Sequence, residues 1–158
     1  MNNREIEAIL YKCKYTKNIF YGCHPIDHLN RCLFKSKKLK IFVFNTDVSG
    51  GAGKHWVLVL IKNNTVRFYD SLNLYDLIVK KLKISQSIPY RIQALTSNVC
   101  GAHVILLAIL FAIGVPHSEI FKRVYRKNRF SYNDLLARRF TRNYTKELFS
   151  SSSSKKHV

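Results

Sequence analysis

The sequence predicts an α+β fold, and three stretches of the chain support this. Residues 41–44 form a continuous apolar run, which indicates a buried strand. Residues 55–61 and 65–70 are rich in β-branched and aromatic side chains and flank a short polar turn, which predicts a hairpin. Residues 100–113 are apolar nearly all round a helical wheel, which predicts a helix buried on every side.

The 158 residues are expected to form one domain over residues 1–149, because a chain of this length can bury a substantial core. Residues 150–158, five serines followed by Lys-Lys-His-Val, are expected to form a disordered Ser/Lys tail.

The other elements follow from periodicity and from punctuating residues. A short helix is expected over residues 5–12, and its apolar residues share one face: Ile6, Ile9 and Leu10. The helix over residues 100–113 is ended by Gly114 and Pro116. The remaining expectations are an irregular stretch over 13–34, a glycine-containing loop over 45–54, a helix over 76–82, a strand over 89–95 and a basic, mostly helical stretch over 120–149.

The hairpin places a histidine and an aspartate on one face. If Asn63 and Asn64 form a two-residue turn, Asp70 lies opposite Val57, and His55 shares their face because side chains alternate along a strand. Such diagonal neighbours have Cβ atoms about 7–8 Å apart, within reach of an imidazole–carboxylate hydrogen bond. Taken singly, His55 fits a core histidine and Asp70 fits a turn cap. The shared face favours a functional pair.

Cys100 stands where a polar loop, residues 96–98, meets the apolar helix. The positive end of the helix dipole and a nearby imidazolium lower the pKa of a thiol in such a place, and Gly101 leaves room for a substrate. Gln93 has an amide that can donate to an oxyanion together with the Cys100 N–H. A base, a carboxylate, a thiol and an oxyanion donor are the parts of a cysteine hydrolase. The alternatives are a small buried cysteine and a surface glutamine.

Lysine and arginine total 27 residues against 9 aspartates and glutamates, a formal net charge of +18. This excess favours polyanions, nucleic acid first and acidic membrane surfaces second. The alternative is a charge that only keeps the surface solvated. The candidate nucleic-acid-binding residues lie in one basic run: Lys122, Arg123, Arg126, Lys127, Arg129, Arg138, Arg139 and Arg142.

The four cysteines form no CxxC pair and have no regular spacing, so we expect no secreted disulfide framework. The polar start of the sequence contains no secretory signal. The longest apolar run, residues 104–115, is too short to span a bilayer. We therefore expect a soluble protein in a reducing compartment, without a membrane partner.

Three further patterns are expected to carry no function. Four residues could be taken for metal ligands: Cys23, His24, His28 and Cys32. Their spacing matches no common zinc pattern, so no metal site is expected. His103 is expected to pack in the helix rather than to act as the base. The glycine-rich residues 50–53 lack the lysine–hydroxyl pair of a P-loop.

With these residues in place, the chain resembles the adenovirus-type cysteine proteases (adenain) and, more distantly, the ubiquitin-like-protein proteases that share their fold. Residues 53–56 resemble the family's base segment, residues 68–71 its acid segment, and Gln93 with Cys100-Gly101 its oxyanion and nucleophile segment. Upstream residues that also resemble the adenovirus enzyme are 5–9, 20–22, Asp27 and 44–46.

The resemblance implies a papain-like arrangement, a mixed sheet with a central buried nucleophile helix against it. It implies that Cys100 attacks a peptide carbonyl, that His55 acts as base and then acid, and that Asp70 orients His55. Gln93 and the Cys100 N–H would bind the oxyanion, and Trp56 would pack beside the catalytic pair.

The resemblance also implies substrates cut after small residues, often glycine. Such an enzyme processes viral capsid and core precursors in the host nucleus and in virions, assisted by DNA and by a short disulfide-linked peptide. The chemistry needs no cofactor, and a monomer is expected.

The sequence departs from the adenovirus pattern in three places. Its acid is Asp70, where those enzymes typically have glutamate; aspartate is usual among the ubiquitin-like-protein proteases. No cysteine lies between residues 33 and 99, where a peptide-linking thiol would be expected. The chain is also short at its C-terminal end.

Three functions are therefore weighed. The favoured one is a viral maturation protease that acts on capsid and core precursors. The second is a protease of the same fold that removes ubiquitin or a ubiquitin-like modifier (a deubiquitinase or deSUMOylase). The third, of another class, is a non-enzymatic basic DNA-binding virion core protein, which explains the charge but leaves the catalytic residues as coincidence.

Overall fold

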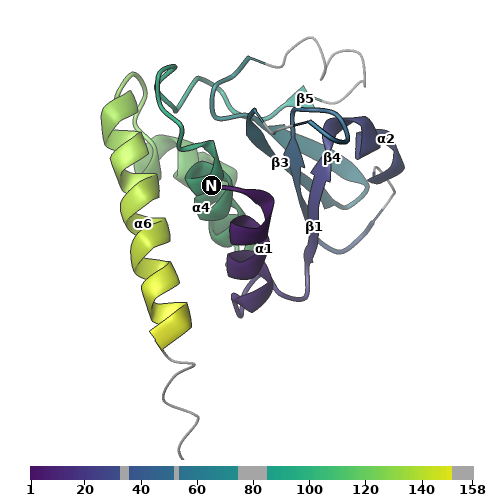
Figure 1. Ribbon diagram of the computed structural model, residues 1–158. Helices are drawn as coiled ribbons and strands as arrows, with labels where there is room; N and C mark the ends of the chain where they lie inside the picture. Colours follow the sequence, from purple (N-terminus) through teal and green to yellow (C-terminus); the bar gives the residue numbers. More distant parts are fainter. Residues whose placement is uncertain (33–35, 52–53, 75–84, 151–158) are drawn as a thin grey trace, which may run out of the picture.

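The computed structural model describes residues 1–32, 36–51, 54–74 and 85–150. The described elements lie in layers across Figure 1: α6, then α4 with α1, then the sheet, with α2 on the far side of the sheet. The mixed sheet against a buried helix is the α+β arrangement that the sequence predicts.

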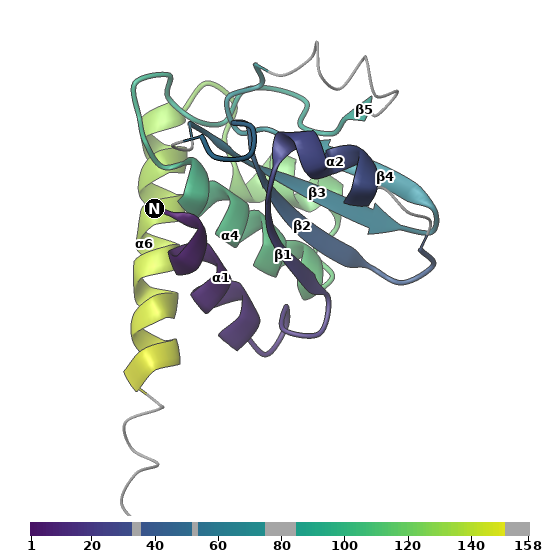
Figure 2. The same cartoon turned by 45° about the vertical axis from the view of Figure 1, so that its right-hand side comes forward.

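The sheet is mixed and has five strands in chain order (Figure 2). The strands are β1 (Phe20–Pro25), β2 (Lys40–Asn45), β3 (Trp56–Lys62), β4 (Thr65–Tyr69) and β5 (Ser85–Gln86). The pairs β2–β3 and β3–β4 are antiparallel, whereas the outer pairs β1–β2 and β4–β5 are parallel. The parallel edge strand β1 falls in the stretch expected to be irregular. Its pairing register shifts between Phe20 and Cys23, which explains why no regular pattern marks it.

The β3–β4 hairpin has the predicted register. Asn63 and Asn64 both have positive φ angles, 51° and 59°, as the two central residues of a type I′ turn require. Leu58 pairs with Tyr69, and Lys62 pairs with Thr65 at the turn. Continuing that register past the last pair brings the residues that flank the hairpin, 55 and 70, to the same end of the sheet.

Helices α1 and α4 cover one face of the sheet, and α6 packs on the outer side of these two helices. The three helices are α1 (Asn3–Lys12), α4 (Cys100–Ala112) and α6 (Phe130–Ser150). An Asn2–Glu5 capping box starts α1. Helix α4 has ten buried residues in succession and ends before Gly114, whose φ of 84° suits a residue without a Cβ. The predicted all-round burial of α4 is therefore confirmed.

The opposite face of the sheet carries a second, smaller apolar cluster. Short helical turns cover it: η1 (Ile26–His28) and α2 (Leu29–Cys32). Leu29 packs there on the outward-facing strand residues Phe42, Phe44, Val57, Val59, Ile61 and Phe68. Both faces of the central strands β2 and β3 are thus buried.

The strand expected over residues 89–95 is wrong. The N–H groups of Ile92 and Gln93 both donate to one carbonyl, Ser71 O, each at 3.0 Å, so the backbone turns here instead of pairing. Ile92 is buried while Leu95 is exposed, and a loop accommodates that pattern as well as a strand does. The helix expected over 76–82 and nearly all of the expected tail lie outside the described residues.

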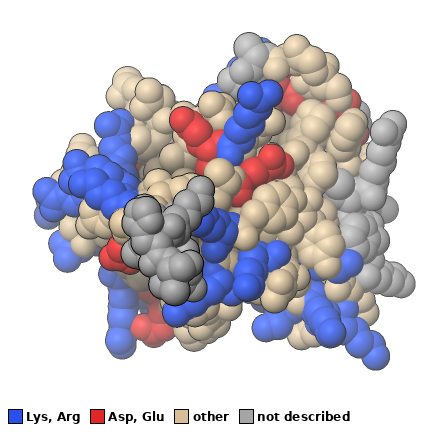
Figure 3. Space-filling model, turned by 60° about the horizontal axis from the view of Figure 1, so that its bottom comes forward, with Lys and Arg blue, Asp and Glu red and all other residues tan. Residues whose placement is uncertain are grey.

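The C-terminal basic stretch is mostly helical, as expected. It forms η2 (Ile120–Val124) and α6, and the short helix α5 (His117–Glu119) comes directly before it. Among the described residues, no helix has both the length and the apolar character needed to cross a membrane. Figure 3 shows Lys and Arg side chains spread over several parts of the visible face, with Asp and Glu between some of them.

Candidate active site

His55 and Asp70 meet at the open end of the hairpin. His55 directly precedes β3 and Asp70 directly follows β4. His55 Nε2 lies 2.6 Å from Asp70 Oδ1, and the two residues are 6% and 0% exposed. The backbone N–H groups of Leu72 and Leu74 also donate to the Asp70 carboxylate, at 2.9 and 2.8 Å. Asp70 is therefore fixed by three donors, and the imidazole–carboxylate contact that the hairpin geometry predicts is present.

Cys100 completes this group from the first turn of α4. Its thiol is hydrogen-bonded to His55, and the backbone N–H groups of Trp56 and Gly101 also point toward the sulfur. Because His55 Nε2 is engaged by Asp70, Nδ1 is the ring nitrogen left for the thiol. The order Cys100–His55–Asp70 is that of a nucleophile, a base and an orienting carboxylate.

The pKa values of the three groups shift toward an ion pair. Burial lowers the pKa of His55, but the hydrogen bonds and charges of Asp70 and Cys100 outweigh it and raise that pKa to about 9. Burial raises the pKa of Cys100, but the hydrogen bond and charge of His55 bring it below the usual thiol value. Burial also raises the pKa of Asp70, but the hydrogen bond and charge of His55 outweigh burial, so the pKa of Asp70 is lowered overall. A thiolate beside an imidazolium is the reactive form of a cysteine nucleophile.

Gln93 lies in the loop before α4 and is buried, so it is not a surface glutamine. Ser71 Oγ donates to Gln93 Oε1 at 2.6 Å, and Gln93 Nε2 donates to Ser97 O at 2.9 Å. Ser71 follows Asp70 in the chain, so the glutamine is tied to the same corner of the sheet. The amide has two N–H groups, and one of them is used by Ser97.

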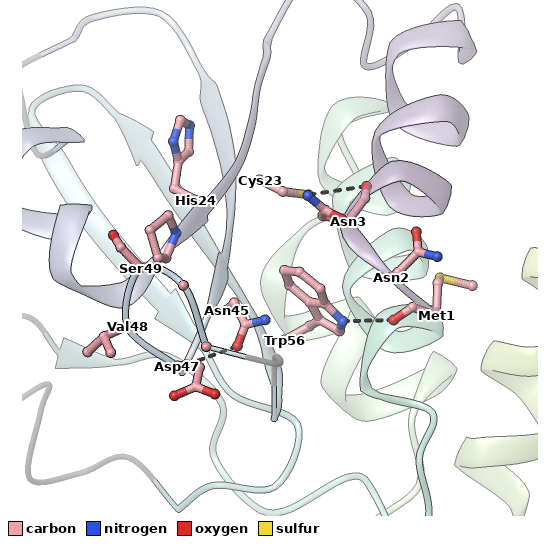
Figure 4. Close-up of a pocket in the computed structure, with 13 residues that line it drawn as sticks. Met1, Asn2, Asn3, Cys23, His24, Asn45, Asp47, Val48, Ser49 and Trp56 are labelled. Atoms are coloured by element: carbon pink, nitrogen blue, oxygen red, sulfur yellow. Dashed lines mark hydrogen bonds between the residues drawn. The ribbon is translucent and has the colours of Figure 1, made fainter.

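Trp56 lines a pocket of about 410 Å³ (Figure 4). Its Nε1 donates to Met1 O at 3.1 Å, and Figure 4 shows the indole edge pointing toward Met1. Met1 also covers Gly101, where an added Cβ would come within 3.0 Å of it. The rest of the lining comes from Asn2, Asn3, Cys23, His24, Pro25, Asn45 and the 47–51 loop. This hollow beside Trp56 is a candidate place for a substrate chain.

A second histidine–aspartate pair lies between α4 and α6, and sequence reasoning missed it. His103 Nε2 lies 2.9 Å from Asp134 Oδ1, and His103 Nδ1 lies 3.1 Å from the Tyr125 hydroxyl. His103 faces away from solvent, as a helix-packing residue does, but its contacts are polar. A histidine in an otherwise apolar helix was the available signal, because a buried imidazole needs partners.

The residues set aside as zinc ligands point to different partners. Cys23 Sγ faces Asn3 O at 3.9 Å, His24 Nε2 faces Tyr21 O at 2.8 Å, and His28 Nε2 faces Ser49 Oγ at 3.4 Å. Among the described residues, no group of three or more His, Cys, Asp or Glu side chains is placed to hold a metal ion.

The basic run lies on η2, on α6 and on the turn between them. Its eight Lys and Arg residues are exposed. Arg123 forms an exposed ion pair with Glu119, Arg126 lies over the Tyr132 ring, and Arg138 reaches Asn98. Arg138 and Arg142 line a hollow beside α1, and the other six residues lie outside it.

No protein-family model matches the sequence, and no curated protein is detectably similar to it. Two solved structures are similar in fold: the ASFV pS273R protease and its selenomethionine form. Both superpose with a TM-score of 0.55, at 12% and 13% sequence identity, over 86% and 87% of this chain. The chain has the fold of a viral cysteine protease. It spans 65% and 66% of the length of those two chains, less than two thirds.

These neighbours refine the resemblance seen in the sequence. They agree with the cysteine-protease fold that the resemblance implied, and they do not single out the adenovirus enzymes. At such identity the likeness concerns the fold, and the activity has to be argued from the site itself.

Proposed function

We propose that this protein is a cysteine endopeptidase. The observation that carries the proposal is the buried chain of contacts from Asp70 through His55 to Cys100, with Cys100 in the first turn of a buried helix. Two segments far apart in the sequence supply these residues. The fold of the ASFV pS273R protease supports the same conclusion.

In the proposed reaction, the Cys100 thiolate attacks the scissile carbonyl carbon, and the carbonyl oxygen becomes an oxyanion. The free N–H of Gln93 and the Cys100 backbone N–H donate to that oxyanion. His55 then gives its proton to the leaving amine. In the second half of the reaction, His55 removes a proton from the water that hydrolyses the thioester. Asp70 holds the imidazole in position throughout.

We propose protein substrates cut after small residues of the glycine type. The favoured substrates are viral capsid and core precursors, processed in the host nucleus and in the virion by a monomeric enzyme without a cofactor. Removal of ubiquitin or a ubiquitin-like modifier is the second candidate, and the resemblance of the chain to the ubiquitin-like-protein proteases favours it. Hydrolysis of modifier conjugates but not of capsid-precursor peptides would select the second candidate.

DNA is the proposed polyanionic partner, as activator or as scaffold. The support is the net charge of +18 and the exposed basic run on η2 and α6. Phosphate contacts make binding steeply salt-dependent, with a slope of about −0.9 per contact in a log–log plot. Affinity for duplex DNA measured from about 50 to 200 mM salt tests this. A salt-independent weak affinity would remove DNA from the proposal.

The decisive experiment measures Cys100 alkylation and peptide hydrolysis together. Iodoacetamide should modify Cys100 rapidly near pH 6.5, and Cys100→Ala should abolish hydrolysis of a fluorogenic peptide amide ending in Gly-Gly. Cys13→Ala is the matched control, because Cys13 is completely buried outside the pocket and exposes no thiol to iodoacetamide. Hydrolysis retained without Cys100 would refute the proposal. An unreactive Cys100 with tight, salt-sensitive DNA binding would favour the non-enzymatic core protein.

A further inference from the structure

The second histidine–aspartate pair belongs to a polar cluster that joins α4, α6 and residues 92–97. A carboxylate only accepts hydrogen bonds, so His103 Nε2 carries the proton that it donates to Asp134 Oδ1. Nδ1 is then an acceptor, and the Tyr125 hydroxyl donates to it. His103 and Tyr125 are completely buried, and every polar atom of the two side chains has a partner.

The same part of α6 holds the backbone on both sides of Gln93. Asn133 Nδ2 donates to Ile92 O at 3.0 Å. The N–H of Ala94 donates to Asp134 Oδ2 at 3.3 Å. Two consecutive residues of α6 therefore bond the two neighbours of the glutamine, and Ser71 holds its side chain from the other direction.

Asp134 thereby links two functional parts of the protein. One carboxylate oxygen contacts the helix that begins with Cys100, and the other contacts the loop that carries Gln93. An oxyanion donor has to be held to within about 0.5 Å of its productive place. A displacement of about 1 Å costs as much as about 100-fold in rate.

We propose that Asp134, itself oriented by His103, is a positioning residue that fixes the Gln93 loop relative to Cys100. The inference rests on the proposed function. In this role, Asp134 and His103 hold the Gln93 loop in place from a position away from the reacting atoms and do not exchange protons with them. Asn133 shares the role through Ile92.

The chain offers a graded set of variants. Asp134→Ala removes both acceptors. Asp134→Asn can restore both contacts, because its oxygen can accept from Ala94 while its amide donates to the other tautomer of His103. Thr141→Ala is the matched control: Thr141 is buried on the same helix, and its hydroxyl has no hydrogen-bond partner in the described part of the chain.

The experiment measures three quantities on the full chain: kcat and KM with the fluorogenic Gly-Gly peptide amide, the rate of Cys100 alkylation by iodoacetamide, and amide hydrogen exchange of residues 92–97. We expect Asp134→Ala to lower kcat by about 10- to 100-fold with little change in KM. Alkylation should stay at the wild-type rate, because His55 and Asp70 are untouched. Exchange of the 92–97 amides should become faster. Asp134→Asn and Thr141→Ala should stay within about threefold of wild type in kcat, a spread too small to count as a lost positioning contact.

Two results would overturn the inference: faster exchange with an unchanged kcat, or equal losses of alkylation and hydrolysis, which would indicate general damage to the site. Failure of Asp134→Asn to restore kcat while it restores slow exchange would also count against it. Failure of the proposed function is recognisable separately, because wild-type protein would then show no Cys100-dependent hydrolysis before any residue of α6 is changed.

Discussion

Among the residues that the structure describes, two histidine–aspartate pairs are buried, one at the end of the sheet and one between α4 and α6. The His55–Asp70 distance is 2.6 Å, and the His103–Asp134 distance is 2.9 Å. The pKa values of the two histidines nevertheless shift in opposite directions. The pKa of His55 rises to about 9, whereas burial lowers the pKa of His103 more than Asp134 raises it.

The difference lies at the second ring nitrogen. His55 faces the thiol of Cys100, which can become anionic and stabilise an imidazolium. His103 faces the hydroxyl of Tyr125. Burial raises the pKa of that hydroxyl, so the hydroxyl stays neutral. A histidine–aspartate pair in a sequence is therefore ambiguous, and the third partner decides whether it is a reactive group or a fixed hydrogen-bond bridge.

The largest expected effect separates the two histidines in reactivity. His55→Ala should lower peptide hydrolysis by at least about 10³-fold, because the general base and the imidazolium that stabilises the thiolate are both lost. Alkylation of Cys100 near pH 6.5 should fall to the rate of an ordinary thiol. His103→Ala should leave that alkylation rate close to wild type. Equal losses in the two variants, measured by iodoacetamide labelling, would erase the distinction between the pairs.

His103→Ala should instead appear in stability. It opens a cavity in a closed cluster and removes a hydrogen-bond donor from Asp134 and an acceptor from Tyr125. We expect a loss of about 3 kcal/mol in the free energy of unfolding, measured with urea. A loss below about 0.5 kcal/mol would mean that the cluster is not a structural bridge.

The pH dependence of stability should have opposite signs for the two pairs. The folded pKa of His55 is raised, so its contribution is fully present below about pH 6.5, the ordinary value for histidine, and is lost as the pH rises through about 9. The folded pKa of His103 is lowered, so its contribution is present above about pH 6.5 and is lost as the pH falls. Ring-proton NMR should show His55 titrating near pH 9 and His103 with a pKa below the ordinary value for histidine. Cys100→Ala should lower the pKa of His55, since one anionic partner is gone.

Tyr125→Phe should give the smallest effect. It removes only the hydrogen bond to His103 Nδ1, which is expected to cost about 1 kcal/mol in urea unfolding. Tyr132→Phe, an exposed position on α6, is the matched control and should change stability by less than about 0.5 kcal/mol. A Tyr125→Phe protein as stable as the control would show that Tyr125 does not hold His103.

The sequence was sufficient wherever a local rule had one structural outcome. Two asparagines with positive φ fixed the hairpin turn, and the turn fixed which side chains share a face, so the approach of His55 to Asp70 was predictable. All-round apolar character predicted the burial of α4. Gln93 could be named, but its burial and its bonds to Ser71 and Ser97 could not, because a loop has no periodicity from which to read them.

Contacts between distant segments decide the structural features that no local sequence pattern determines. The segment around Ile92 is compatible with a strand or a loop, and its hydrogen bonds with Ser71 and Asn133 select the loop. The pairing of His103 with Asp134 joins residues 31 apart that no spacing rule connects. The sequence by itself determined the hairpin of β3 and β4, helix α4 and the chemical groups at their ends, since these depend on backbone geometry and near neighbours. Only the tertiary structure decided that His103 meets Asp134 and the phenol of Tyr125, because that depends on how whole elements pack.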